Sequence, residues 1–363
     1  MKRASRLIDC STSFEGSIGV KSSMKKLMRA TMVSTAVALS TGLAQAQSPN
    51  EFYKGKNVTI YIAFSPGGSY DLFGRLVARH IGRHIPGAPT VITSNMPGAG
   101  GLTATNFMYR AAPRDGTAIA IVTQNIAIEE ALKNKAAQYR SSEFNWIGRA
   151  TSTIEVHVLS TKSPGHTIAG AKIHEVPVAS TGPGSPSDSY PRLLNATVGT
   201  KYKVIRGFAG STDGLLAMER EEVDGALTSW NTVKSTRMNW LTEGRVILPV
   251  QYMPKRSRDL KDVPTPLELA TNDPDRKLLA FAISSAEVGR AFFAPPGLPT
   301  DRLSALRDAF NATIKDKELL AEVAKAQLDF DPATGEEMSK IISETLSADE
   351  SVIERMRKIT AID

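Results

Sequence analysis

The chain has 363 residues, a single cysteine and a formal net charge of +7. Of its 44 basic and 37 acidic residues, seven and two lie in the first 46 positions, which leaves 37 and 35 for the rest. This near-neutral remainder excludes the clustered positive charge of a nucleic-acid-binding surface. Cys10 also lies in the first 46 positions, so the rest of the chain has no disulfide, thiol chemistry or cysteine metal site.

The N-terminal segment is predicted to be an extra leader followed by a cleaved signal peptide. A basic stretch that begins at Met24 precedes the mostly apolar run 31–43, and Ala46 ends a small-residue cleavage site of the A-x-A kind. The apolar run is shorter than the roughly 20 residues that a membrane-spanning helix needs. We therefore expect export with cleavage near Ala46/Gln47, from a start at either Met1 or Met24.

Strand-like and helix-like segments alternate from residue 57 onward. The strands are apolar runs that end at Gly, Pro or polar residues, and the helices carry apolar residues at helical spacing. The predicted order is a strand over 57–64, a helix with apolar positions between 72 and 81, a strand over 90–93, a helix over 102–112 and a strand over 118–123. This alternation predicts a parallel, doubly wound sheet, in which ligands bind beyond the carboxyl ends of the strands.

A second α/β unit is predicted after residue 150, and it has glycine loops of its own. Its elements are strands over 155–160 and 176–180, a helix over 189–196 with Pro191 in the first turn, a strand over 203–206, a helix over 215–220 and a strand over 225–229. The chain then passes through 259–266 and 281–294 and ends in two amphipathic helices.

The length of the chain after position 46 predicts two domains, because about 317 residues exceed what one compact core usually holds. An even number of crossings between the domains would return the C-terminal part to the first one. We therefore expect a leader over 1–46, a first lobe made of 47–150 and 291–363, and a second lobe over 151–290.

Two glycine-rich stretches, 65–71 (SPGGSYD) and 95–101 (NMPGAGG), each follow a predicted strand and lead into a predicted helix. Glycine lets the backbone approach a ligand closely, and the N–H groups of a first helical turn point outward. Carboxylate or phosphate is the natural ligand of such a helix start. The pattern predicts paired anion-binding loops, and the alternative is a pair of ordinary strand-to-helix turns.

These stretches resemble the signatures of the Bordetella uptake gene (Bug) family, the periplasmic receptors of tripartite tricarboxylate transporters. Five segments are similar to family motifs and occur in the family's order: 63–71 with Arg75 and Ala78, then 95–101, 113–117, 258–265 and 294–299. The resemblance implies an α/β, two-lobed periplasmic-binding-protein fold, type II-like, in which each lobe is a doubly wound sheet flanked by helices. It also implies a ligand cleft between the lobes and a periplasmic location. Catalysis, a cofactor and a bound metal are not expected.

The resemblance further implies that backbone amides of the two first-lobe loops hold the ligand's carboxylate. Carried over by motif, these residues are Pro66, Gly67, Gly68, Ser69, Asp71, Pro97, Gly98, Ala99 and Gly100. Candidates by position are Thr123, Gln124, Thr181, Gly184 and Ser185, and two aromatic residues that could wall the cleft, Phe208 and Trp230. The second-lobe segment 206–210 (RGFAG) differs from the tyrosine-lysine-glycine segment that relatives often carry.

Several of these side chains also have a purely structural interpretation. Asp71 could orient a ligand, or it could cap its helix and pair with Arg75 at i, i+4. The hydroxyl groups could bind ligand or satisfy nearby backbone, and the aromatic residues could serve packing alone. His80 and His84 have the spacing of metal ligands, but the zinc-protease glutamate is missing between them. A solvated helix face without metal is therefore predicted there.

The main prediction is a monomeric extracytoplasmic solute receptor with no nucleic-acid partner. It would close its lobes over a small organic carboxylate (a di- or tricarboxylate, an acidic amino acid or an aromatic acid) and deliver it to the membrane subunits of a tripartite tricarboxylate transporter.

Two alternatives stay open. An exported enzyme could act on a carboxylate in the same cleft, although the cleft loops offer only Asp71 and hydroxyl groups, without a nearby histidine. A periplasmic sensor partner of a membrane kinase would use the same binding chemistry. After position 46, the sequence contains no hydrolase elbow, Walker loop or complete dinucleotide-binding motif.

Overall fold

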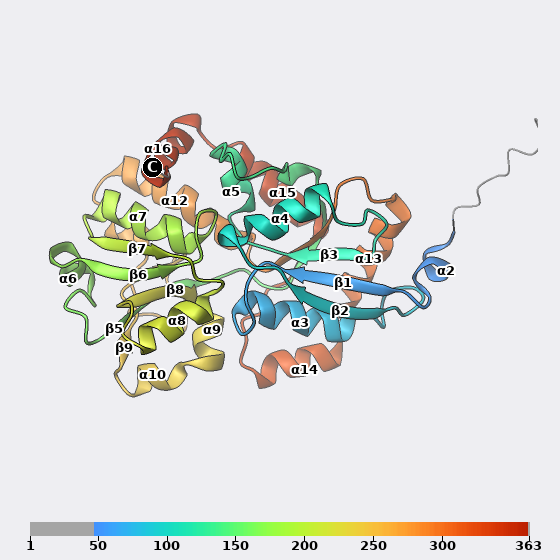
Figure 1. Cartoon of the computed structure of the whole chain (residues 1–363), viewed down its shortest axis with the longest axis horizontal. Helices are drawn as coiled ribbons and strands as arrows, with labels where there is room; N and C mark the ends of the chain where they lie inside the picture. Colours follow the sequence, from blue (N-terminus) through green and yellow to red (C-terminus); the bar gives the residue numbers. More distant parts are fainter. Residues whose placement is uncertain (1–46, 362–363) are drawn as a thin grey trace, which may run out of the picture. The chain divides into compact units, whose positions relative to one another are not determined.

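Two β-sheets organise the part of the chain that the computed structural model describes, residues 47–361 (Figure 1). The predicted leader, the signal peptide and its A-x-A site lie outside the described residues. Helices cover both faces of each sheet (Figure 1). The predicted α/β class with two lobes is confirmed. We call each sheet with the helices packed on it a lobe.

The first sheet is mixed and has the order β12-β4-β11-β3-β1-β2, in which β1, β2, β3 and β4 run in one direction and β11 and β12 in the other. Strand β1 pairs in parallel with β2 and β3, as the βαβαβ alternation predicts, whereas β11 and β12 run antiparallel to β4. The bounds are β1 Asn57–Ile62, β2 Thr90–Asn95, β3 Ala118–Ile121, β4 Asn145–Arg149, β11 Ala291–Ala294 and β12 Ala333–Thr334.

The second sheet has the order β10-β5-β8-β6-β7, and β9 pairs with β5. Strand β6 is parallel to β7 and β8, and β5 is antiparallel to β8. The bounds are β5 Glu155–Ser160, β6 Val176–Ser180, β7 Tyr202–Arg206, β8 Gly225–Ser229, β9 Val246–Ile247 and β10 Gln251–Tyr252.

The helices follow the apolar spacing of the sequence closely in the first lobe and less closely in the second. Helix α7 begins at Pro186, so Pro191 lies inside the helix rather than in its first turn, as the sequence had suggested. The helices are α2 Pro49–Tyr53, α3 Ser69–Ile81, α4 Leu102–Arg110, α5 Ile126–Ala131, α6 Ile168–Ile173, α7 Pro186–Val198, α8 Ser211–Glu219, α9 Trp230–Thr236, α10 Met238–Thr242, α11 Pro266–Leu269, α12 Asp273–Ser284, α13 Thr300–Thr313, α14 Lys317–Lys325, α15 Gly335–Leu346 and α16 Glu350–Thr360. No helix within residues 47–361 is long and apolar enough to span a bilayer.

Two segments that cross between the sheets run side by side and bond to each other through their backbones. Ala150 N donates to Arg290 O at 3.1 Å, and Arg290 N donates to Thr151 O at 2.9 Å. Thr153 N donates to Ala286 O at 3.0 Å. These segments place the residues that follow β4 and those that precede β11 at the boundary of the two lobes.

The chain crosses between the sheets once more near its C-terminal end. Helix α15 packs on β4 of the first sheet, whereas α16 packs on α7 and α12. Ile353 and Met356 of α16 are buried in the same apolar cluster as Leu193 of α7 and Leu278 of α12. The last helix therefore contributes to the core of the second lobe.

Candidate functional site

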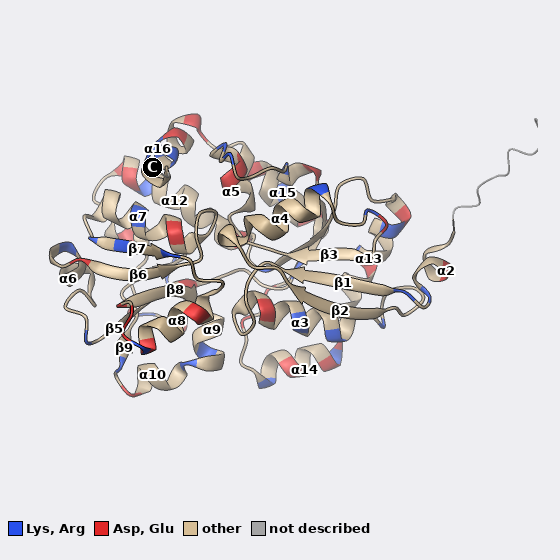
Figure 2. Cartoon of the chain, in the orientation of Figure 1, with Lys and Arg blue, Asp and Glu red and all other residues tan. Residues whose placement is uncertain are grey.

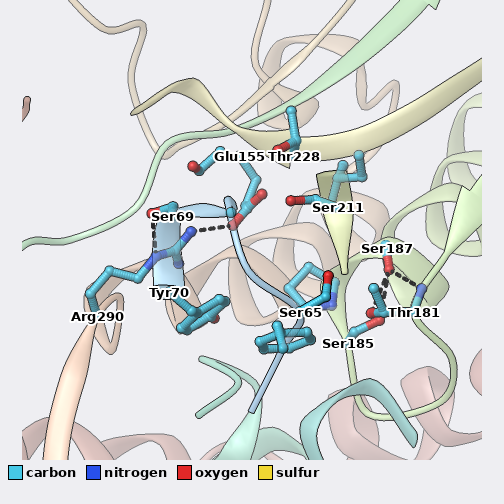
Figure 3. Close-up of a pocket in the computed structure, with 15 residues that line it drawn as sticks. Ser65, Ser69, Tyr70, Glu155, Thr181, Ser185, Ser187, Ser211, Thr228 and Arg290 are labelled. Carbon is cyan, nitrogen blue, oxygen red and sulfur yellow. Dashed lines mark hydrogen bonds and ion pairs between the residues drawn. The ribbon is translucent and has the colours of Figure 1, made fainter. Parts of the chain in front are cut away.

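A small cavity lies between the lobes, beyond the carboxyl ends of β1, β6 and β8 (Figure 3). Its volume is about 50 Å³, which leaves room for only a few water-sized groups. Residues 64, 65, 68–70 and 290 line it from the first lobe, and residues 155, 181, 185–187, 211 and 227–229 line it from the second. Residues of both lobes therefore face this space.

Three helices, α3, α7 and α8, begin at the cavity wall. Their first residues, Ser69, Pro186 and Ser211, all line the cavity. None of the three is capped by a side-chain hydrogen bond from its N-cap residue. Ser69 N donates to Thr232 Oγ1 at 3.1 Å and Pro186 has no N–H, so these two positions offer no free donor. Other first-turn N–H groups of a helix generally lack partners inside it, and three helix starts around one cavity favour an anion.

Each of these helices also has an aspartate in its first turn, and its negative charge weakens the positive electrostatic potential at the helix start. Asp71 bonds to Arg75 at 2.9 Å, and Asp188 bonds to Arg206 at 2.6 Å, so both charges are balanced. Asp213 of α8 is different, because it accepts a hydrogen bond from the Ser65 hydroxyl at 2.5 Å and forms no ion pair within residues 47–361. The second-lobe wall therefore lies nearer to uncompensated negative charge than the first.

Arg290 forms the floor of the cavity and is only 2 % exposed. Its Nε donates to Ser69 Oγ at 2.8 Å, and its Nη2 donates to Glu155 Oε1 at 3.2 Å. Nη1 donates to Gln124 Oε1 at 3.0 Å and Thr153 Oγ1 at 2.6 Å. This buried guanidinium is held in one orientation by groups from both lobes and from the crossing segments.

Tyr70 and Glu155 complete the polar surroundings of this guanidinium. The Tyr70 ring lies 4.0 Å from the guanidinium carbon, a cation–π distance. Burial raises the pKa of Tyr70 to about 12, so its hydroxyl stays neutral, and it accepts a hydrogen bond from Gln124 N at 2.9 Å. Burial also raises the pKa of Glu155, although the nearby Arg290 acts in the opposite direction.

Four of the residues predicted from the sequence line the cavity: Gly68, Ser69, Thr181 and Ser185. Pro66, Gly67 and Asp71 belong to the same first loop but do not line the cavity. Gly67 N donates to Asp71 Oδ2 at 3.1 Å. Although burial acts to raise it, hydrogen bonds from Arg75, Asn95 and this backbone N–H hold the pKa of Asp71 below its usual range. Asp71 thus stabilises the conformation of the loop. Of the two interpretations of this residue, its contacts favour the structural one over contact with a ligand.

The second glycine-rich loop lies against the second lobe instead of the cavity. Gly100 N donates to Thr181 O at 2.9 Å. A Cβ atom at Gly100 would lie 2.7 Å from Gly182 O and closer still to Pro183 O. Thr123, behind this loop, donates to the backbone oxygen of a residue in the same second-lobe turn, at 3.0 Å. The remaining predicted members of this group line no part of the cavity: Pro97, Gly98, Ala99, Gly184.

The other three predicted residues also lie outside the cavity lining. Gln124 is fully buried and accepts a hydrogen bond from Arg290. Trp230 packs in the second-lobe core and donates from its indole nitrogen to Asp259 Oδ2 at 2.9 Å. Phe208 lines a narrow neighbouring pocket. These side chains support the walls of the cavity from behind.

Sequence reasoning missed Arg290, Glu155, Tyr70, Ser187, Ser211 and Thr228, which all line the cavity. Glu155 opens the mostly buried strand EVHVLS, and Arg290 immediately precedes the apolar strand AFFA. A charged residue next to a buried strand was the available signal, because such a charge needs a partner.

His80 and His84 do not lie on a solvated helix face, and that prediction is wrong for His80, which is 4 % exposed. His80 Nε2 lies 2.8 Å from Glu322 Oε1, and His84 Nε2 lies 2.8 Å from Asp316 Oδ2. Figure 2 shows basic and acidic residues on both facing helices, α3 and α14. His80, Asp316 and Glu318 could approach one metal ion, but the Arg83 guanidinium bonds both acids at 2.6 Å. This arrangement is an ion-pair network that joins two helices.

Comparison with known proteins identifies the family. Residues 75–357 match the tripartite tricarboxylate transporter family receptor, TctC. A curated Pseudomonas protein, described as a UPF0065 protein in the tcbD-tcbE intergenic region, is 24% identical over 292 residues, which cover 79% of this chain and 82% of that protein. The chain therefore belongs to the TctC receptor family, and the resemblance noted in the sequence is confirmed.

Solved structures show the same fold. The periplasmic binding protein BugD matches with a TM-score of 0.69 and 20% identity, over 85% of this chain and 98% of its own. MatC from Rhodopseudomonas palustris with bound malate matches with a TM-score of 0.65 and 21% identity, over 84% and 99%. An R. palustris protein with adipate matches with a TM-score of 0.65 and 17% identity, over 85% and 98%. The two-lobed periplasmic-binding-protein fold is therefore shown.

Proposed function

We propose that this member of the TctC receptor family is a periplasmic receptor that closes over a small organic carboxylate. It presents the ligand to the membrane subunits of a tripartite tricarboxylate transporter, and it acts as a monomer without catalysis. One observation carries the proposal: three helix starts whose N-cap residues form no side-chain cap surround one interlobe cavity above the buried Arg290. The fold relatives that carry malate and adipate support the same ligand class.

Hydrogen bonds rather than helix dipoles would supply most of the affinity. One helix terminus contributes about 0.3–1 kcal/mol to a nearby anion, whereas a hydrogen bond to a charged group contributes about 1.5–3 kcal/mol. We assign direct ligand contact to the residues that line the cavity in the first turns of α3, α7 and α8. The second glycine loop, with Gly100 and Thr123, would instead hold the lobes together.

Closure would link ligand binding to the shape that a transporter recognises. Ser65 N of the first lobe donates to Ala209 O of the second at 3.2 Å, and Ser69 N donates to Thr232 Oγ1 at 3.1 Å. A ligand that contacts both walls of the cavity binds the shut form better, so it shifts the population toward that form.

Titration with a panel of organic acids tests this proposal. Calorimetry on the mature protein should give saturable binding for at least one small carboxylate, and tryptophan fluorescence should report closure. The matching amide of each acid is the control, because it keeps the shape and loses the charge. Binding of sugars or metal cations with no response to any carboxylate would refute the ligand class. Recovery of unchanged ligand after prolonged incubation distinguishes a receptor from an exported enzyme.

A further inference from the structure

The cavity contains a buried acid that an anion-binding site does not need. Glu155, the first residue of β5, is 6 % exposed and lines the cavity beside Arg290. Only its Oε1 is engaged, by Arg290 Nη2 at 3.2 Å. Its second oxygen, Oε2, accepts no hydrogen bond from any of residues 47–361. A carboxylate oxygen of a buried acid thus has no donor among residues 47–361.

Two hydroxyl groups on the same second-lobe wall also lack partners. Thr228 Oγ1 is buried and has no hydrogen-bond partner in the described chain. The Ser211 hydroxyl likewise makes no hydrogen bond within residues 47–361, and it faces Gly68 across the cavity, where a Cβ atom would lie 3.3 Å from Ser211 Oγ. Figure 3 shows Thr228 and Ser211 near each other on the second-lobe wall, and the Glu155 carboxylate between this wall and the Arg290 guanidinium that it contacts.

The residues that line the cavity differ in the hydrogen bonds that they offer. Arg290 is a donor, whereas Glu155, Thr228 and Ser211 have oxygens without donors, and we call these three residues the acceptor wall. The guanidinium of Arg290 donates to four different residues and reaches Glu155 through Nη2 alone, so it leaves the Oε2 atom of Glu155 free to accept from a ligand. Asp213, close to Ser211 in the first turn of α8, adds a second negative charge behind the acceptor wall. A second carboxylate on a ligand would be repelled there, whereas a group with several N–H donors would satisfy the free oxygens.

We infer that the ligand carries a protonated amine as well as a carboxylate. The starts of α3 and α7 hold the carboxylate, and Glu155 accepts hydrogen bonds from the ammonium together with Thr228 and Ser211, the latter at the start of α8. This inference rests on the proposed function and narrows its ligand class to amino-bearing acids. Glu155 is then the residue that selects against plain dicarboxylates of the same length.

Acids that differ only by an amino group test the inference. Succinate with aspartate, glutarate with glutamate, and butyrate with 4-aminobutyrate form such pairs, and calorimetry gives the affinity ratio of each. For the pair that fits the cavity, we expect the amino acid to bind about tenfold tighter or more, the ratio that one hydrogen bond to a charged group supplies. In Glu155→Gln, which keeps the shape and loses the charge, the ratio should fall to about one or below.

Further variants make the outcome decisive. Glu155→Asp keeps the charge but moves the carboxylate away from the ligand by the length of one methylene. Its affinity ratio should therefore lie between those of the unmodified protein and Glu155→Gln. Glu175→Gln is the matched control, because this exposed residue pairs with Lys203 away from the cavity, and its ratio should equal that of the unmodified protein. Thermal melting shows whether each variant folds.

The possible results separate this inference from the proposal on which it rests. If the unmodified protein binds the plain acid of every pair as well as its amino partner, the inference is wrong while the receptor function stands, and this comparison needs no variant to fold. If Glu155→Gln keeps the full ratio, Glu155 is not the selecting residue. If no acid in the panel binds, the receptor function itself fails.

Discussion

The two glycine-rich loops of the first lobe have similar sequences and different neighbours. The loop at 65–69 lines the cavity and begins helix α3 there. The loop at 97–101 meets the second-lobe turn at 181–185, where Gly100 N bonds to Thr181 O. Under the proposed function, glycine would serve ligand access in the first loop, whereas in the second it allows close contact of the two lobes. Local sequence cannot separate these roles, because the difference depends on what the other lobe brings against each loop.

The largest effect should come from Gly100→Ala. Its φ is +64°, and its new Cβ would collide with backbone atoms of the second lobe. The shut form should become much less accessible, so ligand affinity should fall about 100-fold or more while the fold persists. Gly199→Ala is the control, because its φ is +81° and nothing lies within 4 Å. Equal affinities in the two variants would show that the second loop does not control closure.

Solution pH should distinguish the surroundings of the two loops. Glu129 lies behind the second-lobe turn, in a pocket that Pro183 and Gly184 also line. It is 5 % exposed, and burial raises its pKa to about 7, with Asn134 opposing this shift and Asp188 adding to it. Because its folded-state pKa exceeds the unfolded one, stability is greatest at low pH and falls as pH rises toward 7.

Glu129→Gln removes this titration. The variant should gain up to about 3 kcal/mol over the unmodified protein above pH 7 and much less at pH 5. Asp71 beside the first loop has the opposite sign: its lowered pKa stabilises the fold above the unfolded value, and this contribution is lost as pH falls through the folded-state pKa. Urea unfolding at pH 5 and pH 8 measures both. A stability difference between Glu129→Gln and the unmodified protein that does not vary with pH would contradict the assignment.

The smallest effects should come from two single hydroxyl groups. Ser69→Ala leaves a buried Arg290 N–H without its acceptor, which costs about 1.5–3 kcal/mol, and it should weaken ligand binding as well. Thr123→Val removes a neutral hydrogen bond to Gly184 O and should cost about 1 kcal/mol. Unfolding and calorimetry on both variants give the comparison. A larger loss of ligand affinity in Thr123→Val than in Ser69→Ala would reverse the roles given to the two loops.

Local patterns predicted the parts of the fold that depend on local pairing. The β1–α3–β2–α4–β3 order follows from periodicity and from glycine and proline signals within about 70 residues. Strands β4, β11 and β12 did not stand out, because each pairs with a segment far along the chain. Phe292, for example, pairs with Gly148.

The candidate site was predicted in part for the same reason. Gly68, Ser69, Thr181 and Ser185 follow strands directly, so their place at the cavity follows from the topology of the sheets. Arg290 and Glu155 are separated by 135 positions and meet through the backbone pairing of the two crossing segments. Nothing in the residues around either of them indicates that pairing.

Arg290 combines two tasks in one residue. Its peptide group exchanges hydrogen bonds with Ala150 and Thr151 at the boundary of the two lobes, while its side chain lines the cavity that is proposed to hold the ligand. A ligand that displaces the guanidinium would therefore act directly on the backbone segment that connects the two lobes. Substitutions of Arg290 that are meant to change ligand specificity would therefore also change how far the two lobes can open.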